Sequence, residues 1–294
     1  MDVDGLRVSL EDGRTLDVAA AGAADDTPFV FHHGTPGAAI VFEPFVRDVL
    51  ARGLRYVACS RPGYGDSTRR PGRTVADCVV ETVAVVEQLG NDRFYTVGWS
   101  GGAPHALACA ALAPDRVLAA ASIAGPAPVG ADGLDWLGGM GEENVEEFGA
   151  AMAGPDELQS YLEKVGPAFA LVSGERIVAA LGDLVGEVDK AALTGELGAF
   201  LAGNVREGLR NGIWGWFDDD LAFVRDWGFD VGGLKVPVTV WQGAQDRMVP
   251  FAHGQWLAAH APVRACLLTE HGHLSLAVDS FPMILDDLLA SSAG

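Results

Sequence analysis

Short apolar segments alternate with helix-like stretches along most of this chain, and this alternation constrains the fold more than any other feature. Segments of strand character cover residues 6–10, 15–20, 28–32, 55–59, 94–98, 117–123, 236–241 and 264–268. Helical periodicity covers residues 38–52, 74–89, 101–112 and 274–289. Strands that alternate with helices form a mostly parallel sheet covered on both faces. The first two segments flank Glu11-Asp12-Gly13-Arg14, where Asp-Gly favours a hairpin turn. The sequence therefore predicts an eight-stranded α/β sheet that begins with a hairpin.

The alternation stops in the middle of the chain. Between residues 130 and 233, glycine, acidic residues and helical stretches replace the strand signals. We therefore expect an α/β core formed by residues 1–129 and 234–294, and a helical cap (lid) formed by residues 130–233. The cap is inserted after the sixth strand. Ligands of such sheets bind at the carboxyl ends of the strands, so we expect the cap to cover that edge.

Charge and composition limit the partners. The formal net charge is −20 at pH 7, which repels nucleic acid and anionic membranes. No apolar run approaches the roughly 18 residues of a membrane span, and the first residues lack the features of a secretory signal. We therefore expect a cytoplasmic protein that binds neither nucleic acid nor membranes. Whether it forms a homodimer is left open.

The four cysteines argue against a metal site. Cys59, Cys78, Cys109 and Cys266 are scattered without C-x-x-C spacing, which is typical neither of structural zinc nor of a disulfide scaffold. We expect them to be small, mostly buried hydrophobic residues.

The strongest chemical signal is the pentapeptide Gly98-Trp99-Ser100-Gly101-Gly102, which fits G-x-S-x-G. It follows an apolar segment and opens a helical one, as a nucleophile elbow requires. The small neighbours allow Ser100 to occupy a strained turn with its hydroxyl exposed. The N–H of Gly101 would lie at a helix N-terminus, where it could stabilise an oxyanion. Ser100 is therefore the candidate nucleophile.

A second oxyanion donor is expected from the loop His33-Gly34-Thr35-Pro36-Gly37, which follows the third strand. Pro36 has no N–H, and His33 lies too early in the turn. The Thr35 amide is the candidate, and we expect His33 to bond to nearby backbone in a structural role.

Three motifs together resemble those of the α/β-hydrolase superfamily, in the branch of lidded serine esterases, haloperoxidase-like and proline-iminopeptidase-like enzymes. They are the His33-to-Gly37 loop, Arg61-Pro62-Gly63-Tyr64-Gly65-Asp66-Ser67 and the Ser100 pentapeptide, in that order. The resemblance covers about two-thirds of the chain, outside the insertion. It implies an α/β-hydrolase fold and a catalytic order of nucleophile, acid and histidine.

The remaining order identifies an acid and a base. Asp246 follows the seventh strand in a loop that resembles the family's acid loop, and it would orient a histidine. Asp132 and Asp135, after the sixth strand, are alternatives because some family members draw their acid from there. Gly272-His273-Leu274 fits the family's Gly-His pattern before the last helix, so His273 is favoured as base over His271.

A serine nucleophile with a histidine base predicts acyl transfer to water through an acyl-enzyme. We expect a cofactor-free serine hydrolase of small or medium, largely apolar carboxylic esters. One alternative is an aminopeptidase that releases an N-terminal residue, so the substrate is a small-molecule ester or amide. Weaker options with the same residues are perhydrolysis and the hydrolysis of a carbon–carbon bond. A non-catalytic receptor on the same fold is the alternative of another class.

The insertion is expected to shape the substrate pocket. Aromatic residues that could line it include Trp99 beside the serine, and Trp214 and Trp216 in the insertion. Acidic residues there are interpreted as a solvated helix face, with recognition of a substrate amine as the alternative; they are Glu142, Glu143, Glu146 and Glu147. The run Asp218-Asp219-Asp220 is interpreted as charge at a helix N-terminus rather than as a metal site.

Overall fold

The computed structural model describes residues 2–193 and 195–292. Its centre is an eight-stranded sheet in the order β1-β2-β4-β3-β5-β6-β7-β8. Pairing is antiparallel between β1 and β2 and between β2 and β4, and parallel between all the other neighbours. The strands are β1 (Asp4–Ser9), β2 (Thr15–Ala21), β3 (Thr27–His32), β4 (Leu54–Cys59), β5 (Phe94–Trp99), β6 (Val117–Ile123), β7 (Val238–Gly243) and β8 (Arg264–Leu268). The eight-stranded, mostly parallel sheet is as predicted.

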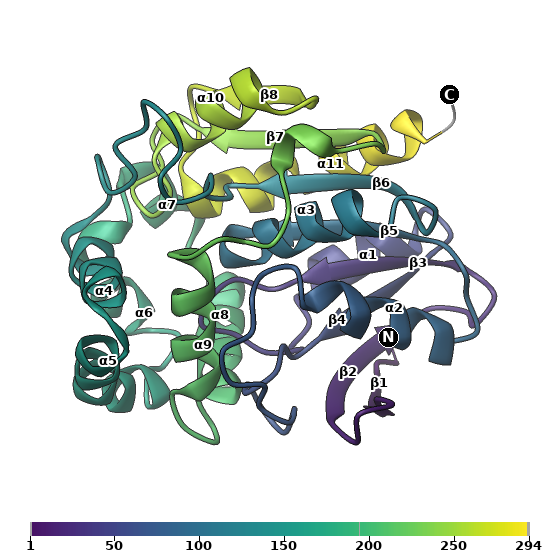
Figure 1. Ribbon diagram of the computed structural model, residues 1–294, viewed down its shortest axis with the longest axis horizontal. Coiled ribbons are helices and arrows are strands. Elements are labelled where there is room, and N and C mark those ends of the chain that lie inside the picture. The colour runs from purple at the N-terminus through teal and green to yellow at the C-terminus, as the bar shows by residue number, and fades with distance from the viewer. Residues whose placement is uncertain (1, 194, 293–294) are drawn as a thin grey trace.

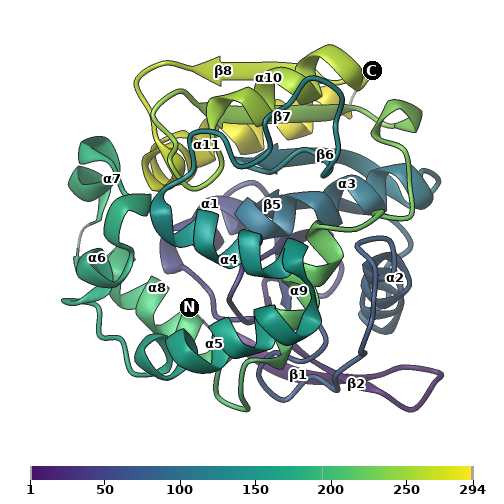
Figure 2. The same ribbon diagram turned by 60° about the vertical axis from the view of Figure 1, so that its left-hand side comes forward.

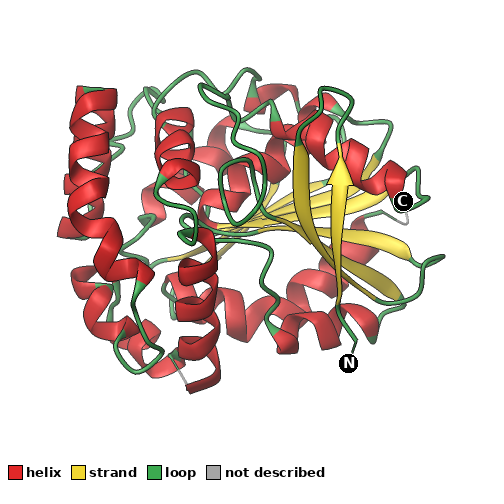
Figure 3. Cartoon of the chain, turned by 90° about the horizontal axis from the view of Figure 1, so that it is seen from below, coloured by secondary structure: helices red, strands yellow, loops and turns green. Residues whose placement is uncertain are grey.

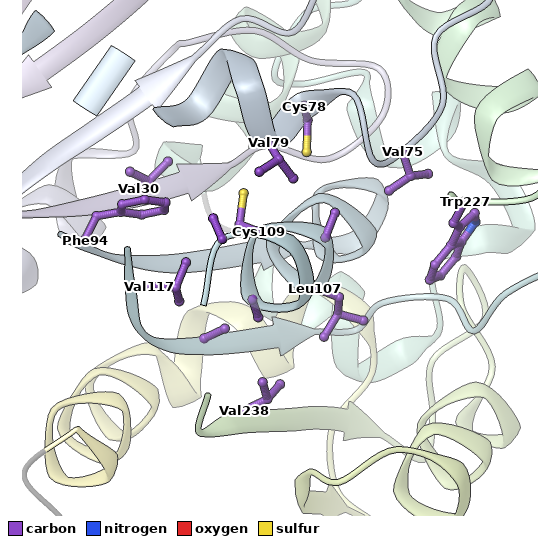
Figure 4. Close-up of a cluster of buried hydrophobic side chains, with 14 of the residues drawn as sticks. Val30, Val75, Cys78, Val79, Phe94, Leu107, Cys109, Val117, Trp227 and Val238 are labelled. Atoms are coloured by element: carbon purple, nitrogen blue, oxygen red, sulfur yellow. The ribbon is translucent and has the colours of Figure 1, made fainter. Parts of the chain in front are cut away.

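Helices cover both faces of the sheet (Figure 3). They are α1 (Glu43–Leu50), α2 (Cys78–Gln88), α3 (Ala103–Leu112), α10 (Phe251–His260) and α11 (His273–Ser291). Neighbouring side chains on a strand point to opposite faces: Val30 joins the core formed with α2, α3 and α10, whereas Phe29 and Phe31 join the core formed with α1 and α11. Figure 4 shows the first core, where Cys78 and Cys109 extend between α2 and α3. This double cover is what an apolar parallel sheet needs to bury both faces.

The helix predicted for residues 38–52 is wrong in its first part, because α1 begins only at Glu43. Pro44 occupies the first turn of α1, where its missing N–H costs no helical hydrogen bond. The preceding amides bond elsewhere: Ala38 donates to the Asn204 side chain at 2.9 Å, and Ala39 donates to the Ser60 hydroxyl at 2.9 Å. The backbone of this loop therefore forms hydrogen bonds with distant residues instead of the hydrogen bonds of a helix.

Residues 130–233, here named the helical insertion, lie between β6 and β7 and contain no strand among their described residues. The helices gather at one end of the sheet, beside the carboxyl ends of the parallel strands (Figures 1 and 2). Leu158, Leu162, Leu209 and Trp216 form part of a small core there. The helices are α4 (Glu142–Ala153), α5 (Pro155–Ala170), α6 (Ile177–Ala180), α7 (Glu187–Ala192), α8 (Gly195–Gly208) and α9 (Trp214–Phe223), with short 3₁₀ turns η2 (Gly182–Leu184) and η3 (Val231–Gly233).

Candidate active site

Ser100 stands at the sharp turn between β5 and α3, in the 3₁₀ turn η1 (Ser100–Gly102). Its φ is +56°, a left-handed conformation that is strained for a residue with a side chain. The glycines of the pentapeptide make this turn sterically feasible: a Cβ on Gly98 would collide with the carbonyl of Gly102, and one on Gly102 would collide with the carbonyl of His32. The motif thus has the backbone geometry of a nucleophile elbow.

His273 and Asp246 are hydrogen-bonded at the same edge of the sheet. The imidazole Nδ1 lies 2.8 Å from Asp246 Oδ2, and both side chains are buried. His273 is the first residue of α11, and Asp246 lies in the loop after β7. The Trp99 ring stacks against the imidazole with centroids 6.0 Å apart. Nδ1 is therefore occupied by the carboxylate, so Nε2 is the nitrogen left for proton transfer.

Three further donors fix the Asp246 carboxylate. The backbone N–H groups of Met248 and Val249 donate to Oδ1 at 2.9 and 2.8 Å. Gln242 Nε2 donates to Oδ2 at 3.0 Å and also to the Val249 carbonyl at 2.6 Å. Gln242 was not among the sequence candidates; its position at the end of β7, four residues before the acid, was the available signal.

The pKa values of this pair move in the same direction for different reasons. Burial lowers the pKa of His273, but attraction to the Asp246 carboxylate and their hydrogen bond outweigh it, so that pKa lies above 6.5. Burial raises the pKa of Asp246, and the charge of His273 offsets only part of this rise. Attraction within the pair thus favours the imidazolium–carboxylate state, which a general base must reach during the reaction.

The alternative acids and the alternative base lie elsewhere. Asp132 and Asp135 are exposed. The carboxylate that is hydrogen-bonded to His273 is that of Asp246. The ring of His271 instead lies 4.0 Å from Asp279 of α11. The geometry therefore separates candidates that the sequence alone left open.

The loop that follows β3 lies against Ser100. A Cβ on Gly34 would be 3.5 Å from Ser100 Cβ, and one on Gly101 would collide with the Thr35 hydroxyl. His33 Nδ1 lies 2.7 Å from the Gly34 carbonyl, and the Arg61 N–H donates to His33 Nε2 at 3.4 Å. Burial and the nearby Arg61 cation hold the pKa of His33 well below 6.5. His33 is thus a neutral ring with both nitrogens in contact with backbone.

Ser100 lies at the junction of a cavity with two lobes. The first lobe, of about 110 Å³, has mostly apolar walls and also contains His273. Its other residues include Phe31, Trp99, Leu181, Phe200, Val205 and Met248. The second lobe, of about 100 Å³, extends from Ser100 and Gly101 to Trp136, Phe148 and Trp216, with Asn144 and Glu147 as polar wall residues. The helical insertion and the sheet loops thus form the cavity together.

Trp99 lines the first lobe and Trp216 the second, whereas Trp214 lines neither. The guanidinium of Arg69 lies 4.1 Å from the Trp214 ring centre, and Phe217 meets the same ring edge-on. Stacking with a cation therefore accounts for this aromatic side chain.

The interpretation of Asp218-Asp219-Asp220 as charge at a helix N-terminus is wrong. All three lie in the interior of α9 and are buried. Asp218 accepts two hydrogen bonds from Arg69, at 2.7 and 3.0 Å. Asp219 pairs with Arg61 and Arg73, each at 2.6 Å. Ion pairs with cations from the core loops, rather than attraction to a helix terminus, therefore hold Asp218 and Asp219.

Asp219 also connects the helical insertion to the loop beside Ser100. It accepts hydrogen bonds from the hydroxyls of Thr35 and Tyr64, both at 2.8 Å. Arg61, its ion-pair partner, donates to the Thr35 hydroxyl at 3.0 Å and to the Gly34 carbonyl at 3.1 Å. Burial opposes ionisation of Asp219, but Arg61 and Arg73 outweigh it and hold its pKa well below 3.8. The candidate oxyanion loop is therefore fixed by a buried charge cluster.

Glu147 is the only one of the four glutamates of α4 that lines either lobe. Its carboxylate accepts a hydrogen bond from the Trp216 indole at 2.8 Å. Burial raises its pKa to about 7, and burial with repulsion from Glu147 raises the pKa of Asp220 well above 3.8. The two neighbouring acids are thus protonated more readily than ordinary carboxyl groups.

Among the residues that the structure describes, no helix has the length and apolar character of a membrane span. Among the same residues, no group of three or more histidine, cysteine or acidic side chains could hold a metal ion.

Comparison with known proteins identifies the family of this chain. The family model described as alpha/beta hydrolase fold matches residues 27–278. The chain belongs to the α/β-hydrolase fold family. A non-heme chloroperoxidase from Streptomyces lividans is 27% identical over 287 residues, which cover 96% of this chain and 98% of that protein. Membership of this family supports hydrolase activity for the chain.

Solved structures of the α/β-hydrolase fold extend over the whole chain. An esterase from Exiguobacterium antarcticum has a TM-score of 0.69 at 18% identity, covering 99% of this chain and all of that one. A bromoperoxidase from Bacillus anthracis also has a TM-score of 0.69 at 18% identity, covering 98% of this chain and all of that one. At these identities the likeness concerns the fold.

Proposed function

We propose that this α/β-hydrolase cleaves small or medium, largely apolar carboxylic esters through an acyl-enzyme on Ser100. One observation carries the proposal: His273, which is hydrogen-bonded to Asp246, lines the same apolar cavity as a serine held at φ +56°. A serine in this turn has an exposed hydroxyl, and the paired histidine supplies the base that the hydroxyl needs.

The reaction follows from these positions. Ser100 Oγ attacks the ester carbonyl while His273 Nε2 accepts its proton, and Asp246 stabilises the imidazolium that results. The N–H groups of Thr35 and Gly101 bind the developing oxyanion. His273 then returns the proton to the leaving alkoxide. Water, deprotonated by the same histidine, attacks the acyl-enzyme and releases the acid and Ser100.

The cavity walls support a neutral substrate. The first lobe is lined mainly by aliphatic and aromatic side chains, which favour an apolar acyl or alcohol group. The helical insertion supplies most of the second lobe, so we propose that it acts as a cap that sets specificity. Asp219, a buried anion of this cap, accepts a hydrogen bond from the Thr35 hydroxyl and so connects the cap to the candidate oxyanion loop.

A second candidate is an aminopeptidase, and Glu147 is the observation that favours it. Its carboxyl group lies in the wall of the second lobe, which begins at Ser100. A carboxylate there could pair with the free amine of a substrate whose carbonyl rests on Ser100. A raised pKa works against this candidate, because the group is partly protonated at neutral pH.

A turnover panel on the purified protein tests these functions. It pairs short- and long-chain nitrophenyl esters with amino-acid nitroanilides, with Ser100→Ala and His273→Ala as controls. We expect the wild-type protein to hydrolyse the esters, and we expect both variants to lose this activity. Nitroanilide turnover that Glu147→Gln abolishes would replace the proposal with the aminopeptidase. An arm with acetate, hydrogen peroxide and a halide tests perhydrolysis, the weaker option that uses the same residues; one similar protein is named a chloroperoxidase. Absence of turnover with every substrate would favour a non-catalytic receptor.

A further inference from the structure

Asp189 lies in α7 of the helical insertion, and its side chain is fully buried. Its carboxylate accepts three backbone hydrogen bonds from the start of α11. The His273 N–H donates to Oδ2, and the N–H groups of Leu274 and Ser275 donate to Oδ1, each at 2.9 Å. The Ser275 hydroxyl donates to Oδ1 at 2.9 Å as well. One carboxylate from the insertion thus binds the first turn of the helix that carries His273.

These contacts replace the ordinary cap of a helix. The first N–H groups of a helix have no partner within it, and the preceding residue usually accepts one with its side chain. In α11 that residue is Gly272, which has no side chain. Its own N–H donates to the Ser275 hydroxyl at 2.8 Å. The acceptor for the helix therefore comes from Asp189, 84 residues earlier in the chain.

The presence of glycine at position 272 supports the same reading. Its φ is −100°, outside the left-handed region that favours glycine. A Cβ at Gly272 would instead collide with the carboxyl group of Asp189. The space beside His273 is thus shaped for this carboxylate.

We propose that Asp189 is a positioning residue for the base His273, which it holds in place by capping α11 from the helical insertion. The proposal rests on the function above, in which His273 is the general base. Three hydrogen bonds to consecutive residues fix the backbone from which the imidazole extends. Contact between α7 and α11 therefore couples the docking of the helical insertion to the position of the base.

The charge of Asp189 gives this role a measurable signature. Two charged groups act on the imidazole: Asp246, from the loop after β7, and Asp189, from α7. Both raise the pKa of His273, whereas burial lowers it. Replacing Asp189 by a neutral residue removes one of these attractions, so the pKa of His273 should fall. A residue that only fills space, with no charge acting on the imidazole, would leave that pKa unchanged.

The test compares Asp189→Asn with Glu187→Gln. Glu187 belongs to the same helix but is exposed, and it pairs with the exposed Lys190, so its amide controls for loss of charge from α7. The measurements are kcat and KM across pH, and the NMR titration of the His273 ring, assigned by its loss in His273→Ala. We expect Asp189→Asn to lower kcat by up to about 100-fold with little change in KM, because a small displacement of the base misaligns the reacting atoms. Its His273 midpoint should move about 0.5–1 pH unit toward acid. Glu187→Gln should match the wild type.

The outcomes separate this inference from the proposed function. A folded Asp189→Asn with wild-type kcat, or one whose His273 titration does not move, would overturn the positioning role while wild-type turnover still supports the function. Absence of turnover in the wild type would refute the function, and the NMR titration would still report on Asp189. Should Asp189→Asn fail to fold, Gly272→Ala retains every charge but displaces the carboxylate. We expect it to lose kcat similarly, and wild-type kcat there would overturn the inference.

Discussion

Replacement of Asp219 by Asn should lower the free energy of unfolding by about 3 kcal/mol, the lower end of the range for breaking a buried ion pair. Asp219 is the shared anion of Arg61 and Arg73, whose side chains are only 4% and 3% exposed. The amide would leave both cations buried without a counter-charge. The loss stays at the lower end because neutral acceptors remain: Arg61 still donates to the carbonyls of His33 and Gly34, and Arg73 to that of Gly215.

Urea unfolding followed by circular dichroism would measure this loss, with Asp218→Asn as the matched control. Asp218 is the preceding residue of the same helix, but its partner Arg69 is 30% exposed and can regain water. The control should therefore lose only about 1 kcal/mol. Equal losses in the two variants, or a loss below about 1 kcal/mol in Asp219→Asn, would refute the view that Asp219 anchors α9 to the core.

Three further predictions use the same measurements or simple kinetics. Because burial of Asp219 is outweighed by Arg61 and Arg73, its pKa in the folded protein lies well below 3.8; its stabilisation is therefore present above about pH 4, and the stability difference between wild type and Asp219→Asn should shrink as pH falls below about 4 toward the folded-state pKa. Because His273 acts unprotonated and its pKa is raised, kcat/KM should fall as pH decreases, with a midpoint above 6.5; a midpoint below 6.5 would contradict the pairing with Asp246. Phe281 is fully buried and stacks on Phe45 with ring centroids 3.8 Å apart, so Phe281→Ala should lower the free energy of unfolding in urea by about 3–5 kcal/mol. Met283 is half-exposed on the same helix, so Met283→Ala should lower it by less than about 0.5 kcal/mol.

Features set by local sequence could be predicted. The strands were evident because apolar residues cluster at strand length between turn signals, and Gly13 adopts the φ of +86° that the predicted hairpin turn needs. The Ser100 turn was evident because its glycines prevent collisions within a few residues of the motif.

Features set by distant partners could not be predicted. Nothing near Asp218-Asp219-Asp220 reveals that its counter-charges lie on loops about 150 residues away. Asp189 gave no signal for the same reason, since its hydrogen bonds are made 84 to 86 residues later. The start of α1 was misplaced because the amides before it bond to Asn204 and Ser60 rather than within a helix. Periodicity registers which face of a segment is apolar, but it does not identify the partner of a buried polar group.

We propose that Ser100 is a nucleophile activated by His273. Reaction with a fluorophosphonate, followed by mass spectrometry of the digested protein, tests it most directly because labelling requires an activated serine and no knowledge of the substrate. We expect one modification, on Ser100, that is absent in Ser100→Ala and much slower in His273→Ala. No labelling of the folded wild type, or labelling at another residue with Ser100 unmodified, would contradict it.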